Sequence, residues 1–321
     1  MTKISKNFSQ ISLFLLLIFC AFALLFGSFG YAVTDGLNLW LACVVPALFP
    51  YLFITTLLSG INITKTISMR LSPVTSKVFR VNGMVGYAFI TSVIAGYPIG
   101  AKTVADLRQN QLLSPTEAVR ASAFCSTPSP MFLISSVGGI MFKNKIFGLF
   151  LFLANLLSAI IVGVIFSFYK RNEPATHGGK LTAVKSDNLL YDGVYSSVIT
   201  VLCVGGLIAV FSVLTEILLT LNILTPFTKL LGLILDGNQS QGVIIGLFES
   251  TKGLKNLSQT VNLWSLPLCG FITAFGGISV IAQSVAYLQS AKIKIAPFIL
   301  AKILSAIFCF LICLILSLSF F

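Results

Sequence analysis

The chain has 321 residues, of which 56% are hydrophobic and 9% are charged, and its mean hydropathy is +0.98. Because soluble domains carry about 25% charged residues, this composition excludes an ordinary soluble protein and predicts an all-α polytopic membrane protein. The net charge of +12 is typical of basic cytoplasmic loops. Since Lys and Arg form no cluster interleaved with aromatic residues, we expect no nucleic-acid partner.

About seven segments are apolar and long enough to cross a bilayer, which takes about 20 residues in a helix. The predicted spans are Ile11–Phe26, Leu37–Leu58, Thr116–Met141, Phe147–Tyr169, Val194–Leu221, Leu263–Leu288 and Ala296–Leu318. The first fits a cleaved signal peptide as well as a retained span. We favour retention, because the loop after it is short and another span follows.

Two shorter apolar runs break at a glycine and continue into polar residues. Met84–Ile99 reaches the tip Gly96-Tyr97-Pro98 and returns through Gly100–Leu113, and a weaker copy occupies Gly242–Gln259. Backbone groups freed at membrane depth must be buried in protein or face a water-filled cavity. We therefore predict two re-entrant hairpins. For the first, a full span followed by an external loop is the alternative.

Two predicted spans contain breaks. Cys125–Pro130 holds two prolines and three hydroxyl residues inside Thr116–Met141, and Gly276-Gly277 interrupts the span after Leu263. The breaks fit either kinked spans patched by Ser and Thr side chains or discontinuous helices whose ends face a substrate. Before the first break, Ser114, Pro115 and Glu117 predict a capped helix start.

An internal repeat relates the two halves of the chain. Four patches recur in order: Leu71–Thr75 with Leu224–Thr228, Asn82-Gly83 with Asp236-Gly237, Val93–Gly96 with Val243–Gly246, and Leu153–Ile160 with Leu300–Ile307. Each half holds three spans and one hairpin, and an odd number of spans inverts the second copy. The predicted division is an extra N-terminal span at 1–33, a first repeat at 34–170, a cytoplasmic linker at 171–190 and a second, inverted repeat at 191–321.

The distribution of charge agrees with a cytoplasmic N-terminus. In that topology the external basic residues are few, and the rest of the 21 Lys and Arg lie on or near the cytoplasmic side, as the positive-inside rule expects. The external ones are Lys143, Lys145, Lys229, Lys252 and Lys255.

Three stretches resemble a known family. Gly96-Tyr97-Pro98-Ile99-Gly100-Ala101-Lys102, Ala123-Phe124-Cys125 and Phe275-Gly276-Gly277-Ile278-Ser279 are similar to the sporulation integral membrane proteins of the YlbJ family. That family falls within the nucleoside-recognition, or Gate, domain proteins. The resemblance implies a spore-forming bacterium and its cytoplasmic membrane. It also implies a core similar to the hairpins of concentrative nucleoside transporters and to the membrane part of ferrous-iron transporters.

Ionisable residues at membrane depth are costly and point to function. Glu249, in the second tip, fits a cation ligand, a proton carrier or an acceptor for a polar solute, and equally an ion pair with Lys252 or Lys102. We expect Lys302 to extend toward the interface. Gly148, in an ordinary predicted span, is expected to tolerate a side chain better than Gly96.

The sequence thus predicts a secondary transporter of a small polar solute or ion. The alternative is a non-transporting membrane component of spore envelope assembly. Enzymatic motifs are missing: HExxH, GxSxG, a Walker A loop and GxGxxG. We expect no catalytic residues, no metal and no cofactor, and leave open a coupling sodium ion or proton and a homodimer. The candidate substrate-binding residues are Gly96, Tyr97, Pro98, Gly100, Lys102, Ser126, Thr127, Ser129, Glu249, Ser250, Thr251, Gly276, Gly277, Ser279 and Gln283.

Overall fold

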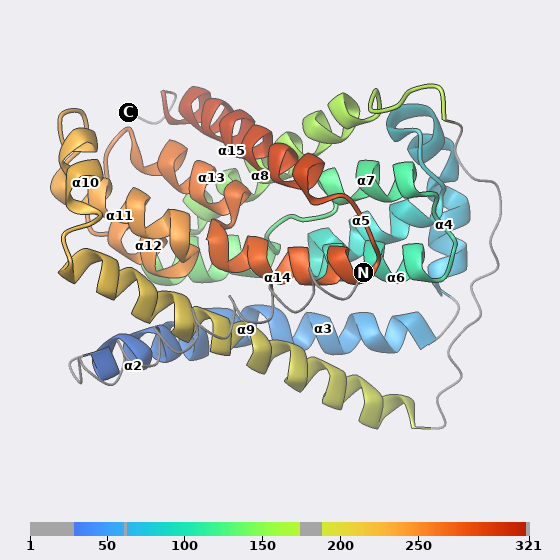
Figure 1. The fold of residues 1–321 in the computed structure, drawn as a ribbon, viewed down its shortest axis with the longest axis horizontal. Coiled ribbons are helices and arrows are strands. Elements are labelled where there is room, and N and C mark those ends of the chain that lie inside the picture. Colours follow the sequence, from blue (N-terminus) through green and yellow to red (C-terminus); the bar gives the residue numbers. More distant parts are fainter. Residues whose placement is uncertain (1–28, 61–62, 174–187, 319–321) are drawn as a thin grey trace, which may run out of the picture.

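The structure is a computed structural model that describes residues 29–60, 63–173 and 188–318. The first predicted span and most of the predicted linker lie outside the described residues. Within these ranges helices are the only regular structure (Figure 1). They are α2 (Gly30–Leu39), η2 (Trp40–Val44), α3 (Val45–Gly60), α4 (Ile63–Val74), η3 (Thr75–Phe79), α5 (Met84–Ala95), α6 (Ile99–Gln109), α7 (Pro115–Phe124), η4 (Met131–Met141), α8 (Lys145–Phe166), α9 (Leu189–Thr220), α10 (Thr225–Leu231), α11 (Gly237–Phe248), α12 (Ser250–Leu257), α13 (Ser265–Phe275), α14 (Gly277–Ser290) and α15 (Ile295–Ser317).

Five helical segments in the described ranges are long and apolar enough to cross a membrane: Gly30–Leu57, Lys145–Phe166, Leu190–Thr220, Ser265–Ser290 and Ile295–Ser317. A sixth candidate is the pair Thr66–Phe79 and Met84–Ala95, which is bent by 94°. The predicted span at Thr116–Met141 is not one helix, because the chain leaves helical geometry between α7 and η4. The protein is therefore a polytopic helical membrane protein.

The same succession of elements occurs in both halves. A long helix (α3 or α9) precedes a short helix (α4 or α10), a helical hairpin (α5–α6 or α11–α12), a broken pair (α7–η4 or α13–α14) and a final long helix (α8 or α15). In Figure 1 the two hairpins lie toward opposite ends of the long axis. Helices α2, α3 and α9 run together beneath the hairpins and broken pairs.

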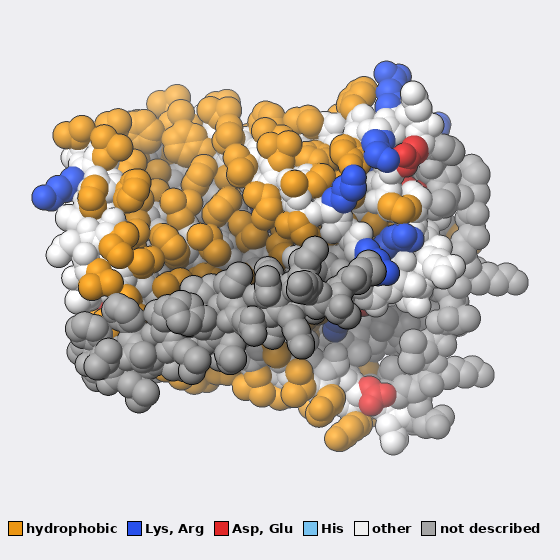
Figure 2. All heavy atoms as spheres, in the orientation of Figure 1, with side chains coloured by type: hydrophobic (Ala, Val, Ile, Leu, Met, Phe, Trp, Pro, Cys, Tyr) orange, Lys and Arg blue, Asp and Glu red, His pale blue; other side chains and the backbone are white. Residues whose placement is uncertain are grey.

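Charged and apolar side chains are segregated on the surface. In Figure 2 hydrophobic side chains cover most of the visible face, whereas Lys and Arg gather near the end where Figure 1 places α4 and α7. The lipid-facing character of α8 and α15 is seen in exposed Leu157 and Ile303. Because an apolar surface suits the hydrocarbon core, the membrane normal is expected to follow the long axis of Figure 1.

The predicted helix start at Ser114 is present as a full capping box. The Ser114 hydroxyl accepts the Glu117 N–H, and the Glu117 carboxylate accepts the Ser114 N–H at 2.9 Å. Glu117 is completely buried and also accepts the N–H of Asn82 at 2.9 Å. One cap therefore joins the start of α7 to the start of the first hairpin.

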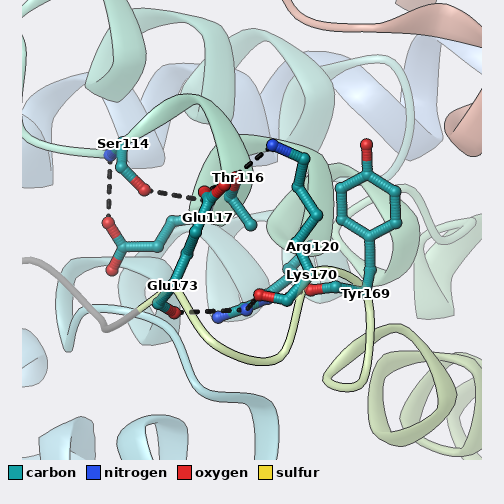
Figure 3. Close-up of polar contacts among 7 residues, drawn as sticks. All are labelled: Ser114, Thr116, Glu117, Arg120, Tyr169, Lys170 and Glu173. Atoms are coloured by element: carbon teal, nitrogen blue, oxygen red, sulfur yellow. Dashed lines mark hydrogen bonds and ion pairs between the residues drawn. The ribbon is translucent and has the colours of Figure 1, made fainter.

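Arg120, one turn further along α7, ties three segments together (Figure 3). Its side chain is 1% exposed and donates to the backbone carbonyls of Arg80 at 2.7 Å, Tyr169 at 3.0 Å and Lys170 at 2.9 Å. A longer bond of 3.4 Å reaches the carbonyl of Glu173. The guanidinium thus satisfies carbonyls that no longer pair within a helix, and it fixes α7 relative to the end of α8.

Candidate functional site

The first hairpin turns at Gly96 and packs directly on the first break. Gly96 has φ +82° and ψ −179°, a conformation that is essentially restricted to glycine. A Cβ at Gly96 would lie 2.9 Å from the nitrogen of Ser129, and one at Gly100 would lie 2.2 Å from the carbonyl oxygen of Cys125. Gly96 therefore forms a tight turn, and at both glycines a neighbouring backbone approaches too closely for a side chain.

Hydroxyl groups add to the contact between the first hairpin and the first break. The Ser92 hydroxyl accepts the Thr127 N–H at 3.1 Å and lies 3.2 Å from the Thr127 hydroxyl oxygen. Ser92 is on α5, and Thr127 is between α7 and η4. The break at Thr127 is therefore hydrogen-bonded to the first hairpin, and this side chain is buried in the protein.

The second hairpin turns at Glu249, which caps α12. Its carboxylate accepts the N–H groups of Thr251 at 3.1 Å and Lys252 at 2.6 Å. Gly277, at the second break, has φ +75°, and a Cβ there would lie 3.0 Å from the carbonyl oxygen of Gly246. The second break thus packs on the second tip, as the first break packs on the first.

A small cavity of about 40 Å³, the space open to the centre of a water-sized sphere, lies where the two tips and the first break meet α14, the helix that follows the second break. Its polar wall includes Glu249, 1% exposed, and Gln283, 6% exposed. Neither the oxygen nor the nitrogen of the Gln283 amide has a hydrogen-bond partner. The cavity is lined by Val44, Leu48, Gly96, Tyr97, Pro128, Ser129, Phe132, Val204, Ile208, Glu249, Ser250, Thr251, Val280 and Gln283.

Of the alternatives left open for Glu249, the ion pair with Lys252 or Lys102 is not formed among the described residues. The Lys252 ammonium instead lies 3.0 Å from the Glu216 carboxylate. That carboxylate also accepts the Tyr31 hydroxyl at 2.5 Å. The partner is 36 residues away in sequence, so the spacing of Glu249 and Lys252 carried no information about it.

The prediction that Lys302 reaches the interface is also wrong. Its side chain is 2% exposed and donates to the carbonyl oxygen of Ser126 at 2.9 Å. The ammonium lies 5.4 Å from the centroid of the Tyr97 ring, within the range of a cation–π contact. A buried ammonium therefore sits behind the first tip, a feature that sequence reasoning missed.

A second, smaller cavity of about 10 Å³ by the same measure adjoins the first break. Its polar lining includes Ser126 and Thr127, together with Asn155, Ser158 and Ser305. The Ser126 hydroxyl is buried without a hydrogen-bond partner. Pro128 lines both cavities, so only the break separates them.

The structure brings most, but not all, of the predicted site residues together. Seven line the larger cavity: Gly96, Tyr97, Ser129, Glu249, Ser250, Thr251 and Gln283. Ser126 and Thr127 line the smaller one. Five form or support the turns without lining either cavity: Pro98, Gly100, Gly276, Gly277 and Ser279.

Lys102 stands apart from both cavities. It lies on α6 with Asp106 one turn further on, and it lines neither cavity. Sequence reasoning missed the apolar wall, which comes from Val44, Leu48, Phe132, Val204, Ile208 and Val280. No local signal distinguishes these side chains from lipid-facing ones, because both environments select the same apolar residues.

Comparison with known proteins gives one informative relative. The chain is 32% identical over 304 residues to a protein of Bacillus subtilis (strain 168) named sporulation integral membrane protein YlbJ. The alignment covers 86% of this chain and 74% of the relative. No protein-family profile and no solved structure matches the chain. On this identity and coverage, and with its apolar helices, the chain belongs to the YlbJ family of sporulation integral membrane proteins.

Proposed function

We propose that the protein is a secondary transporter of the nucleoside-recognition, or Gate, type, which moves a small polar solute or ion and serves sporulation. In this proposal it lies in the bacterial cytoplasmic membrane with its N-terminus in the cytoplasm. The two hairpins are re-entrant, and the two halves form an inverted-topology repeat.

The observation that carries the proposal is the meeting of four helix ends at one cavity. The N-terminal ends of α12 and η4 and the C-terminal ends of α5 and α11 come together around it. Free N–H groups at helix starts favour negative atoms, and free carbonyls at helix ends favour positive ones. Transporters use such half-helix ends to bind solutes near the bilayer midplane.

An unpartnered amide favours ligand binding over a purely structural role. Buried amide groups in folded proteins nearly always have hydrogen-bond partners, and an unpaired one costs about 1–3 kcal/mol. Both amide atoms of Gln283 lack a protein partner at the cavity wall. A solute would supply those bonds, whereas a structural component of spore envelope assembly has no need of them.

Uptake into proteoliposomes tests the proposal. Purified protein would be screened with nucleosides, divalent cations, organic anions and organic cations, with and without a proton or sodium gradient. We expect gradient-dependent uptake of one class, and loss of it in Gln283→Leu. Ile303→Leu, on the lipid-facing side of α15, is the matched control. If well-folded protein moves none of these solutes under either gradient, the transporter proposal is refuted in favour of the structural alternative.

A further inference from the structure

Two arginines share one exposed aromatic ring just beyond the end of α8. The Cζ atom of Arg80 lies 5.3 Å from the centroid of the Phe168 ring, and that of Arg171 lies 5.7 Å from it. Both distances are within the range of cation–π contacts, and Phe168 is 56% exposed. Neither arginine forms an ion pair with a carboxylate among the described residues. Two positive charges therefore stand close together at the surface, and no described carboxylate neutralises either of them.

The carboxylates of this corner already have other partners. Glu173 accepts the Lys170 ammonium at 2.7 Å and also the Thr116 hydroxyl (Figure 3). Glu117 is buried and accepts backbone N–H groups at the starts of two helices. Because these acids are engaged, the surplus positive charge of the corner favours an anion from outside the chain.

The buried Arg120 fixes the two segments that carry the surface arginines. Its guanidinium donates to the carbonyl oxygen of Arg80 at 2.7 Å and to that of Lys170, the residue before Arg171, at 2.9 Å. The side chain is only 1% exposed, so these bonds are made inside the protein. The two backbones are thus held in place before any ligand binds, which lowers the entropy cost of binding.

An exposed apolar stripe leads from the two arginines along α8. Ile165, Ile161 and Leu157 are four residues apart, which places them on one face of the helix, and Phe168 follows in the turn after it. The four side chains are between 36% and 56% exposed. A free phosphate would use only the arginines. A phospholipid would use the arginines for its headgroup and the stripe for its acyl chains.

The segment that leads into Arg80 has the form of an interfacial helix. Together α4 and η3 are bent by 94° relative to α5, so they run across the direction of that hairpin arm. On this segment exposed basic Arg70 and Lys77 are adjacent to exposed apolar Met69 and Val78. Helices of this kind lie at the level of the lipid headgroups, and Arg80 directly follows η3.

We propose that Arg80 and Arg171 bind the phosphate of an anionic phospholipid, whose acyl chains lie along the stripe of Phe168, Ile165, Ile161 and Leu157. The planar guanidinium group of arginine matches the oxygens of a phosphate with parallel N–H···O bonds. The lipid belongs to the leaflet at the basic end of the molecule (Figure 2). The site lies apart from both cavities and does not depend on the proposed transport.

The test uses purified protein that has been freed of native lipid by exchange into a neutral detergent. Phosphatidylglycerol or phosphatidylcholine with the same acyl chains is added, bound lipid is detected by native mass spectrometry, and the melting temperature is measured. We expect phosphatidylglycerol to stay bound and to raise the melting temperature by several degrees, and its binding to weaken as salt is added. Phosphatidylcholine should do neither. Glycerophosphoglycerol, the same headgroup without acyl chains, should have no effect at the same concentration.

A matched pair of double variants separates this site from a general effect of charge. Arg80→Gln with Arg171→Gln should bind phosphatidylglycerol at least about tenfold more weakly. Lys143→Gln with Lys145→Gln removes the same charge at the other end of α8 and should change binding less than about twofold. None of these four side chains is buried, so both variants should melt with wild type when no lipid is present. If the arginine pair proves necessary for folding, Arg171→Gln alone is compared with Lys145→Gln.

Three outcomes would overturn the proposal. Equal binding of phosphatidylcholine and phosphatidylglycerol would show that the headgroup charge is not recognised. Stabilisation by glycerophosphoglycerol as strong as that by phosphatidylglycerol would show a site for a free anion rather than for a lipid. Equal losses in the arginine and lysine variants would show that Arg80 and Arg171 form no particular site.

Discussion

Replacement of Gly96 by alanine should destabilise the protein more than the addition of one methyl group suggests. The backbone at Gly96, with φ +82° and ψ −179°, costs a residue with a Cβ about 1–3 kcal/mol. The new Cβ would also lie 2.9 Å from the Ser129 nitrogen and 3.1 Å from its Cβ, and overpacking typically costs about 1–3 kcal/mol. The combined loss of about 2–6 kcal/mol is a large part of the roughly 5–15 kcal/mol that stabilises a folded protein.

Gly206, on α9, is the matched control. No atom lies within 4 Å of the Cβ that an alanine would add there, and alanine is favoured over glycine inside a helix by about 0.5–1 kcal/mol. Gly148 is unsuitable as that control, because the space around it does not support the expectation that it tolerates a side chain better than Gly96. A Cβ at Gly148 would lie 2.5 Å from the carbonyl oxygen of Leu133, because α8 and η4 cross closely at this point.

The assay is the thermal unfolding of purified protein in detergent, together with the yield of monodisperse protein. Gly96→Ala should melt several degrees below wild type, and Gly206→Ala at or above it. Surviving Gly96→Ala protein should also show weaker uptake, since the tip lines the cavity. Equal melting temperatures for the two variants would refute the argument that the first tip is a strained, closely packed turn.

Three further predictions concern topology, packing and pH. In a background without native cysteines, Asn110→Cys and Gln259→Cys, at the open ends of the two hairpins, should react with an impermeant maleimide from opposite sides; reaction from one side contradicts an inverted repeat. Arg120→Met removes the guanidinium hydrogen bonds to the carbonyls of Arg80, Tyr169 and Lys170 and should cost about 3 kcal/mol, seen as a lower melting temperature and yield. A hydrogen bond from Lys170 at 2.7 Å lowers the pKa of the Glu173 carboxyl. Its stabilising effect is therefore complete at pH 7 and lost as the pH falls through the lowered value, so acidification below about pH 5 should cost wild type more melting temperature than Glu173→Gln.

Features set by a residue's own chemistry could be predicted from the sequence. Proline lacks a donor and glycine reaches positive φ whatever surrounds them. The breaks at Cys125–Pro130 and Gly276-Gly277 and the turn at Gly96 therefore appear where expected. The capping box that begins at Ser114 is likewise local, since both of its partners lie within one turn.

Features set by distant partners could not be predicted. Lys302 bonds to a carbonyl 176 residues away, and α15 is apolar on every side, so its pattern does not show which face is buried. Lys292 and Lys294 lie just before α15. Lys302, two turns into the helix, therefore resembles a lysine whose side chain extends to the membrane interface. Only the packing of α15 against α7 and α8 places the ammonium in the interior.

The apolar wall of the larger cavity, which sequence reasoning missed, bears on how the proposed transport would work. Four of its six residues come from η2, α3 and α9, and α3 and α9 pack against each other and form a layer with α2 (Figure 1). The polar groups come from the hairpin tips and the breaks, which pack against one another through Gly96, Gly100 and Gly277. The cavity therefore lies at a boundary between two units, one of which contributes only apolar side chains while the other also supplies the polar groups. A solute with a polar group and an apolar body would contact both, so we expect the proposed transport to move the two units relative to each other.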